Sequence, residues 1–128
     1  MKYLLDTHIA LWLLEDSEKL SNAARKIIQA VDNEIYASYA SLWEIAIKHK
    51  KYPNEMPISS KKMQYCLRQS NVLLLPIGLE HIIATENLPD IHKDPFDRLL
   101  IAQAITEPMH FLTHDEKLSA YSELVQLV

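Results

Sequence analysis

The sequence predicts an α/β fold in which helices cover both faces of a central, mainly parallel sheet of about five strands, a three-layer α/β/α sandwich. Two observations lead to this prediction. Short apolar runs alternate with longer segments of helical periodicity, which is typical of strand–helix–strand units. The chain has 128 residues, 48% of them hydrophobic, and no repeat or low-complexity tract divides it. We therefore expect residues 1–128 to form a single domain.

The predicted elements alternate along the chain. Apolar runs predict strands at residues 3–6, 35–38, 73–77, 110–113 and 124–128. Helical periodicity, often preceded by a Ser or Asp suited to an N-cap, predicts helices at residues 8–15, 22–32, 42–51, 60–69, 79–87, 96–106 and 115–121.

Particular residues support these assignments. The first strand stops at the carboxylate of Asp6, as a buried parallel strand does where it leaves a sheet. The stripe of the second helix includes Val31, and Ser41 is placed to cap the third helix. Pro76 indicates either an edge position for the third strand or the end of that strand. Right-handed crossovers bring the carboxyl ends of all the strands to one edge of the sheet, with the first strand at its centre.

Composition excludes several classes of site. A single cysteine, Cys66, allows neither a disulfide nor a Cys-based zinc site within one chain, and fits a reducing cytoplasm. A single glycine, Gly78, excludes a P-loop and a dinucleotide-binding loop. The net charge of −4 argues against a generally basic nucleic-acid surface. Neither a membrane span nor a signal peptide fits the sequence, so we expect a cytoplasmic protein.

Four carboxylates fall at strand ends or helix starts that face the same edge of the sheet: Asp6, Glu44, Asp97 and Asp115. Each has an alternative explanation in helix capping. Asp6 can cap its own helix, and Ser41 with Glu44 forms a capping-box pattern. Asp94 can cap the 96–106 helix and Thr113 the last one, which leaves Asp97 and Asp115 surplus to capping.

Together, the four acids are harder to explain as caps. Carboxylates that share a pocket raise one another's pKa values and destabilise the fold unless a cation lies among them. Oxygen ligands without a Cys or His set select Mg²⁺ or Mn²⁺ rather than zinc. Ions of this kind activate water and neutralise charge on a phosphodiester. We therefore expect a metal site at this edge.

Four segments carry a resemblance to the PIN-domain family, specifically to ribonuclease toxins of the VapC type. They are Leu5–His8 with Trp12, Ser38 with Ser41–Ile45, His92–Ala104, and Leu112–Asp115. The third segment is long and specific, and the order and spacing of all four extend the resemblance over nearly the whole chain.

The resemblance implies an α/β/α sandwich that holds Mg²⁺ or Mn²⁺ with acids matching Asp6, Glu44, Asp97 and Asp115, and that cleaves RNA. Thr7 and Thr113 match supporting hydroxyls, and Asp94 lies within the motif although capping is its leading interpretation. The resemblance also implies a small antitoxin partner that covers an apolar groove, and a homodimer for which the apolar N-terminal helices offer a face.

Other residues have competing interpretations. Lys48 either tracks substrate phosphate or pairs with Glu44 one turn away. Arg98 either meets substrate phosphate or forms a salt bridge to Asp94. His8, His92 and His114 lie beside the acidic edge and are treated as supporting residues. Trp12 and Trp43 are predicted to belong to the core rather than to stack on bases, because apolar residues flank both.

Two other functions compete with a ribonuclease. A catalytically silent module that keeps the fold to bind RNA or a protein is disfavoured by the intact set of acids. A receiver domain needs a phosphoacceptor Asp at the end of its middle strand, but the third strand here runs Leu75-Pro76-Ile77-Gly78.

Overall fold

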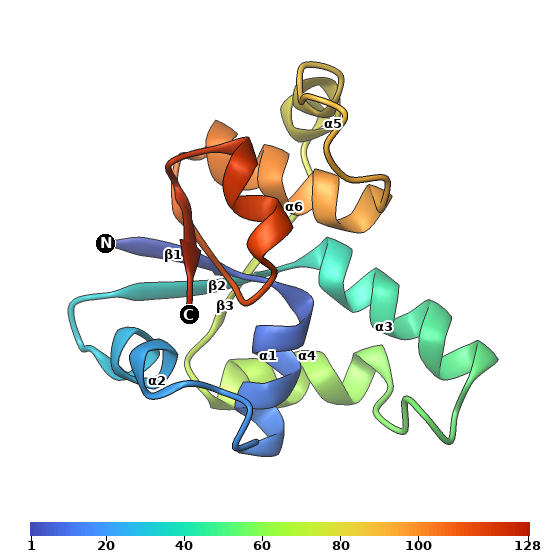
Figure 1. Cartoon of the computed structure of the whole chain (residues 1–128). Helices are drawn as coiled ribbons and strands as arrows, with labels where there is room; N and C mark the ends of the chain where they lie inside the picture. Colours follow the sequence, from blue (N-terminus) through green and yellow to red (C-terminus); the bar gives the residue numbers. More distant parts are fainter.

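A computed structural model describes all 128 residues (Figure 1). The elements in chain order are β1 (Lys2–Leu5), α1 (Thr7–Glu15), α2 (Asn22–Gln29), β2 (Glu34–Ser38), α3 (Tyr39–Lys51), α4 (Ser60–Gln69), β3 (Leu73–Leu75), α5 (Leu79–Thr85), α6 (Pro95–Thr106), β4 (His110–Thr113), the 3-10 helix η1 (Glu116–Tyr121) and β5 (Val125–Leu127). None of the helices combines the length and apolar character needed to cross a bilayer.

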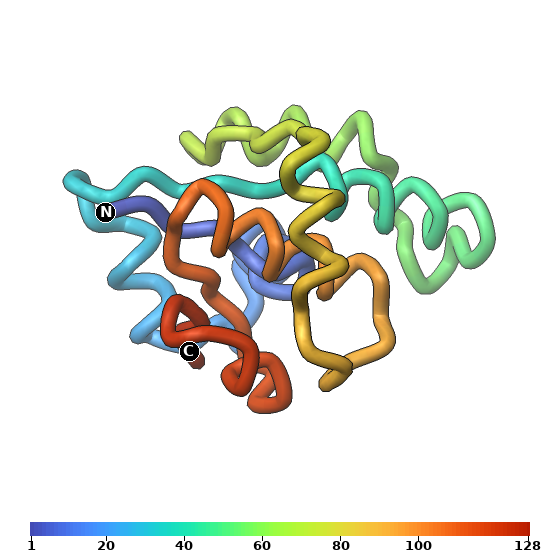
Figure 2. The backbone as a smooth tube through the Cα atoms, turned by 90° about the horizontal axis from the view of Figure 1, so that it is seen from above, coloured from blue at the N-terminus to red at the C-terminus, as the bar shows by residue number.

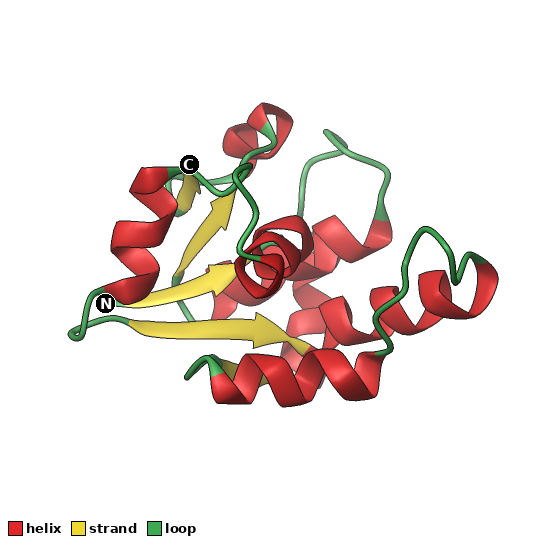
Figure 3. Ribbon diagram, turned by 90° about the horizontal axis from the view of Figure 1, so that it is seen from below, coloured by secondary structure: helices red, strands yellow, loops and turns green.

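The strands form one parallel sheet in the order β3-β2-β1-β4-β5. The predicted central place of β1 and the edge place of β3 are therefore confirmed. Ordered this way, the strands point their carboxyl ends toward one side, as the yellow arrows of Figure 3 show. In the turned view of Figure 2, the dark blue N-terminal strand lies between β2, in cyan, and β4, in orange-red. The α/β sandwich predicted from the sequence is confirmed.

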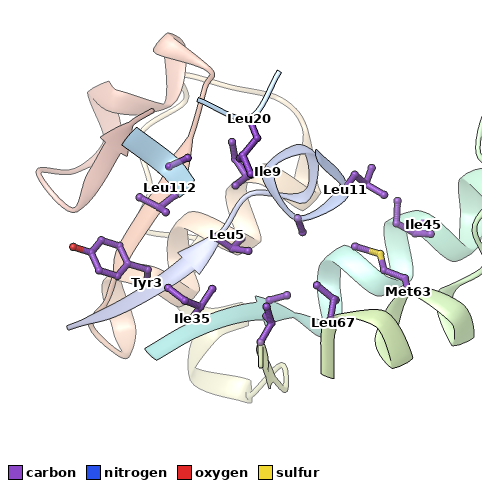
Figure 4. Packing of buried hydrophobic residues seen from close by; sticks show 14 residues of the cluster. Tyr3, Leu5, Ile9, Leu11, Leu20, Ile35, Ile45, Met63, Leu67 and Leu112 are labelled. Carbon is purple, nitrogen blue, oxygen red and sulfur yellow. The ribbon is translucent and has the colours of Figure 1, made fainter. Parts of the chain in front are cut away.

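Side chains of β1 alternate between two cores, one on each face of the sheet. Tyr3 and Leu5 point into the first core, which α1, α2 and α4 cover (Figure 4). Leu4 points into the second core with Phe111 and residues of α6 and η1. Because both faces of β1 are buried, the strand has little freedom to move, and the residue that follows it is held in a defined direction.

The second helix is shorter than predicted, and Val31 is not part of its apolar stripe. Helix α2 ends at Gln29, since Ala30 has an extended backbone with ψ of 125°. The side chain of Asn33 donates to the carbonyl of Ile27 at 2.9 Å and satisfies one of the last carbonyls of the helix. Val31 consequently lies in the turn, where its side chain is 99% exposed.

Candidate metal centre

The four predicted acids lie around one pocket at the carboxyl edge of the sheet. The pocket has a volume of about 520 Å³ and no hydrophobic residue in its lining. Its lining consists of Asp6, Thr7, His8, Glu44, Lys48, Asp94, Asp97, His114, Asp115, Glu116 and Lys117. The structure thus brings together residues that are far apart in the sequence and come from four separate segments.

Asp6 is the most buried of the four acids, with 4% of its surface exposed. Its Oδ1 accepts a hydrogen bond from the backbone N–H of Thr7 at 2.7 Å, so it is the N-cap of α1. Its Oδ2 accepts from the hydroxyl of Thr113 at 2.6 Å. Burial raises the pKa of Asp6, although these hydrogen bonds and nearby His8 oppose the rise. Asp6 is therefore both a cap and a strongly oriented carboxylate.

Glu44 has no capping role, because the capping-box interpretation of Ser41 and Glu44 was wrong. Helix α3 begins three residues earlier than predicted, and Ser38 caps it by accepting from the N–H of Ala40 at 2.9 Å. Ser41 instead shares a buried hydrogen bond of 2.8 Å with the hydroxyl of Thr7. Glu44 therefore lies in the second turn of α3, 7% exposed, where its only ion pair is with Lys48 at 2.7 Å.

Asp97 is the acid of the pocket whose pKa is raised by all the other predicted acids and by Asp94. The pKa of Asp97 is raised to about 7, first by burial and then by the neighbouring charges of Asp6, Asp94, Glu44 and Asp115. Its carboxylate accepts no hydrogen bond in the structure. The helix start is capped by Asp94, which accepts from the N–H of Phe96 at 2.9 Å. Asp97 is therefore surplus to capping, as the sequence predicted, while Asp94 caps the helix and also lines the pocket.

The prediction that Thr113 caps the last helix and leaves Asp115 surplus to capping was wrong. Asp115, rather than Thr113, is the N-cap of η1 and accepts from the N–H of Lys117 at 3.0 Å. The Thr113 hydroxyl accepts from the N–H of Asp115 at 3.1 Å while it donates to Asp6. Thr113 thus links two of the acids and holds the end of β4 next to the end of β1.

His92 reaches two of the acids, which the sequence did not specify. Its Nε2 lies 3.7 Å from Asp97 and 3.8 Å from Asp115. Its Nδ1 accepts from the N–H of Asp94 at 3.0 Å, which fixes the ring. The ring nitrogen and the two carboxylates lie within 4.8 Å of one another. His92 belongs to a loop rather than to the sheet, so strand-end reasoning had no way to place it.

Arg98 does not form the predicted salt bridge to Asp94, and its contact with substrate phosphate stays a prediction. Its guanidinium donates to the carbonyls of Pro89 at 2.9 Å and Thr85 at 3.0 Å, with a longer bond to the hydroxyl of Tyr121. No salt bridge to Asp94 is formed. Arg98 is absent from the pocket lining and ties the loop that precedes α6 to the helix. The Lys48–Glu44 pair, in contrast, is confirmed.

The donor set of this pocket fits a hard divalent cation. Carboxylate oxygens dominate it, no thiolate is present, and of the three nearby imidazoles His92 lies closest to the acids, against Asp97 and Asp115. Such a set is typical of Mg²⁺ or Mn²⁺ and not of a structural zinc site. The raised pKa of Asp97 indicates that, without an ion, the chain leaves the negative charge of these carboxylates largely unbalanced.

A second cluster of Glu80, His81 and Glu107 lies away from this pocket and has a structural explanation. His81 is 2% exposed, and its Nδ1 accepts from the N–H of Gly78 at 2.9 Å. Its Nε2 then carries the proton and donates to Glu107 at 2.6 Å. A metal at Nε2 would require the proton on Nδ1, where it would meet the N–H of Gly78. This cluster therefore joins the start of α5 to the end of α6.

Comparison with known proteins agrees with this geometry. The family model described as PIN domain matches residues 3–124. The chain belongs to the PIN domain family. This PIN domain is 27% identical over 121 residues to the protein named Ribonuclease VapC22 of Mycobacterium tuberculosis, covering 92% of this chain and 90% of that protein. The resemblance to VapC-type members of the family is thereby confirmed.

Solved structures show the same fold. The PIN domain aligns with a chain of VapBC2 from Rickettsia felis bound to a promoter DNA fragment, with a TM-score of 0.71 and 18% identity, covering 100% of this chain and 98% of that one. A chain of VapBC-1 from Haemophilus influenzae aligns with a TM-score of 0.63 and 16% identity, covering 94% and 91%. A toxin–antitoxin complex from Klebsiella pneumoniae gives 0.65 and 18%, covering 97% and 95%.

Proposed function

We propose that this PIN domain is a metal-dependent endoribonuclease that acts as the toxin of a toxin–antitoxin pair. The observation that carries the proposal is the convergence of Asp6, Glu44, Asp97 and Asp115 on one pocket with no apolar lining. The relative named Ribonuclease VapC22 supports RNA as the substrate. We assign these four acids as ligands of Mg²⁺ or Mn²⁺.

The chain's own residues account for placement and charge. Thr113 and the N–H of Thr7 orient Asp6, while Lys48 holds the Glu44 carboxylate against α3. Without an ion, burial and the surrounding carboxylates raise the pKa of Asp97 to about 7, and a bound cation would favour its charged form. A bound divalent ion in such a pocket activates water for attack on a phosphodiester and neutralises the charge that develops. Lys48 lies in the pocket wall, where it can also meet substrate phosphate.

The test is RNA cleavage by an Asp6→Asn variant with and without Mg²⁺. Asparagine caps a helix as well as aspartate does, so its oxygen can accept from Thr7 while its amide donates to Thr113. We expect loss of cleavage with an unchanged circular dichroism spectrum. Asp32→Asn, an exposed acid outside the pocket, is the matched control and should cleave normally.

Two results would count against the proposal. Full cleavage by Asp6→Asn would remove that residue from the metal site. Equal cleavage by the wild-type protein in EDTA and in Mg²⁺ would reject metal dependence altogether. If Asp6→Asn fails to fold, Glu44→Gln tests the same site from α3, where the side chain has no capping role.

The antitoxin is proposed to be a small protein, in keeping with the VapBC complexes among the structural relatives. A groove of about 340 Å³ between α3, the helix that carries Glu44, and α4 is lined in part by Tyr39, Leu42, Trp43 and Ala46. Trp43 is 59% exposed and packs edge-on against Phe96, so its predicted place in the core was wrong. An apolar helix or strand laid in this groove would reach the rim of the acidic pocket.

A homodimer remains part of the proposal, but the N-terminal helices do not offer its face. Helix α1 buries Ile9, Ala10 and Leu11 in the protein's own core. An apolar face is exposed instead on α5, where Leu79, Ile82 and Ile83 are 69%, 52% and 51% exposed. Sedimentation of the wild-type protein and of Ile82→Glu would test this face, with monomerisation expected for the variant.

A further inference from the structure

Three aromatic rings lie together at the rim of the acidic pocket. The ring centroid of His114 lies 4.6 Å from that of Trp12 and 5.8 Å from that of His8. The centroids of His8 and Trp12 are 6.1 Å apart. His8 and Trp12 come from α1 and His114 follows β4, so the sheet order places them side by side. We name these three residues the aromatic rim.

The aromatic rim has exposed polar rings without partners in the chain. His8 and His114 are exposed, and neither ring takes part in a hydrogen bond or an ion pair. Both rings line the acidic pocket, whereas Trp12 is half-buried behind them and packs against the first core. The histidines are therefore not needed to satisfy buried groups of the fold, and their nitrogens and the parts of the rings that do not pack on Trp12 or on each other can contact a ligand.

The charges that line the pocket indicate which kind of contact can add affinity for RNA. Its lining contains six acids (Asp6, Glu44, Asp94, Asp97, Asp115 and Glu116) but only two lysines, Lys48 and Lys117. Lys48 is already paired with Glu44. Phosphate contacts to so acidic a lining can supply little of the affinity for RNA, and the chain as a whole has a net charge of −4. Stacking on a base adds affinity that does not depend on neutralising phosphate.

We propose that the aromatic rim is a subsite for one unpaired base of single-stranded RNA, next to the phosphodiester held at the acids. This inference rests on the proposed ribonuclease function and names the strand form that the site takes. A base in a duplex hides both faces, so only a single-stranded nucleotide can stack on the His114 ring. The His8 ring is inclined at 75° to that of His114, so it can contact the edge of such a base but not its face. The free nitrogens of the same rings can bond the edge of a neighbouring base. Trp12 positions the two histidines.

The test is binding of a random-sequence RNA octamer pool, measured by fluorescence anisotropy with Ca²⁺ present and RNA integrity checked after each titration. His114→Ala should weaken RNA binding about tenfold, within the range for the loss of one stacking contact. His114→Phe retains a ring face and should bind within about twofold of wild type. Inorganic polyphosphate, which has charge but no bases, should bind all the variants equally.

His110→Ala is the matched control. His110 lies at the other end of β4, where it stacks on Tyr3 with a centroid distance of 5.2 Å, and it does not line the pocket. A second readout uses Trp43→Phe, which leaves Trp12 as the only tryptophan. Its emission should change on saturation with RNA and stay constant with polyphosphate.

Three results would overturn the inference. Equal RNA affinity of His114→Ala and wild type would remove His114 from the subsite. An equal loss of RNA and polyphosphate binding would show that His114 acts through phosphate. Constant Trp12 emission at RNA saturation would place the base elsewhere. In all three cases wild-type RNA binding and metal-dependent cleavage remain, so the ribonuclease proposal would stand, whereas an absence of RNA binding by the wild type would reject both.

Discussion

The crowding of carboxylates predicts that Asp97→Asn stabilises the metal-free protein above neutral pH. Asparagine has nearly the shape of aspartate but no charge, so the substitution removes the group on which burial and the other acids act. Asp94 remains in place to cap α6, and the Asp97 carboxylate accepts no hydrogen bond that would be lost. The gain in stability should therefore come from charge alone.

The pKa of Asp97 sets the size and the pH range of this effect. The carboxyl titrates at 3.8 in the unfolded chain and at about 7 in the folded one. Between these values the folded protein holds the extra proton, so its free energy of unfolding falls as pH rises, and the whole penalty is present above pH 7. A separation this large corresponds to about 4 kcal/mol at most. Water in the open pocket screens part of it, so we expect about 2 kcal/mol.

Urea denaturation of both proteins in EDTA at pH 8 and at pH 4 measures the effect. At pH 8 we expect the free energy of unfolding of Asp97→Asn to exceed that of the wild type by about 2 kcal/mol, which corresponds to a melting temperature about 7 °C higher. At pH 4 the two proteins should differ little, because the wild-type carboxyl is then protonated in the folded state. Asp32→Asn, a matched change at an exposed site, should behave like wild type at both pH values.

The reasoning fails if Asp97→Asn is less stable than wild type at pH 8, or if its advantage is the same at pH 4. The first result would mean that the Asp97 carboxylate stabilises the fold. The second would mean that the substitution raises stability for a reason unrelated to charge. Adding Mg²⁺ at pH 8 should reverse the ranking, since the ion stabilises the wild type and loses a ligand in the variant.

Three further predictions concern the surroundings of the site. Millimolar Mg²⁺ or Mn²⁺ should raise the melting temperature of the wild type, and no shift by calorimetry would argue against a four-acid metal site. Thr113→Val deprives Asp6 of its 2.6 Å hydrogen bond in a buried place, so urea denaturation at pH 8 should show a loss of about 2 kcal/mol; an unchanged stability would show that water replaces the hydroxyl. Arg98→Lys loses the forked contacts to Thr85 and Pro89, so limited proteolysis should cut residues 86–93 faster; weaker RNA binding with normal resistance to protease would instead favour a phosphate contact.

The sequence predicted that the four acids meet at one edge of the sheet, which the structure shows, but it did not predict all of their local roles. Capping patterns are short and overlap, so the sequence predicted Ser41 as the cap of α3, whereas Ser38 caps the helix and Ser41 bonds to Thr7. Thr113 and Asp115 were likewise exchanged as caps. In each case a contact between segments distant in sequence determined which side chain met the helix start.

Trp43 and Arg98 illustrate what local patterns miss. Both were interpreted from their neighbours in sequence, which indicate a helix face but not what packs against it. Trp43 lies on a face of α3 that α4 and α6 cover only in part, and Arg98 points toward a loop whose course has no periodic signal. Neither position could be predicted without knowing how α3, α6 and the 86–93 loop are arranged.

The sequence by itself determined the α/β class, the order of the elements and which acids meet at the carboxyl edge of the sheet, because alternating periodicities and strand ends marked by acids are local properties. Only the tertiary structure decided that Asp6 is both cap and candidate ligand, that Thr113 joins it to Asp115, and that His8, Trp12 and His114 share one rim. These features depend on β1 lying beside β4, a pairing of strands more than a hundred residues apart. Burial on both faces of β1 then holds the two strand ends together.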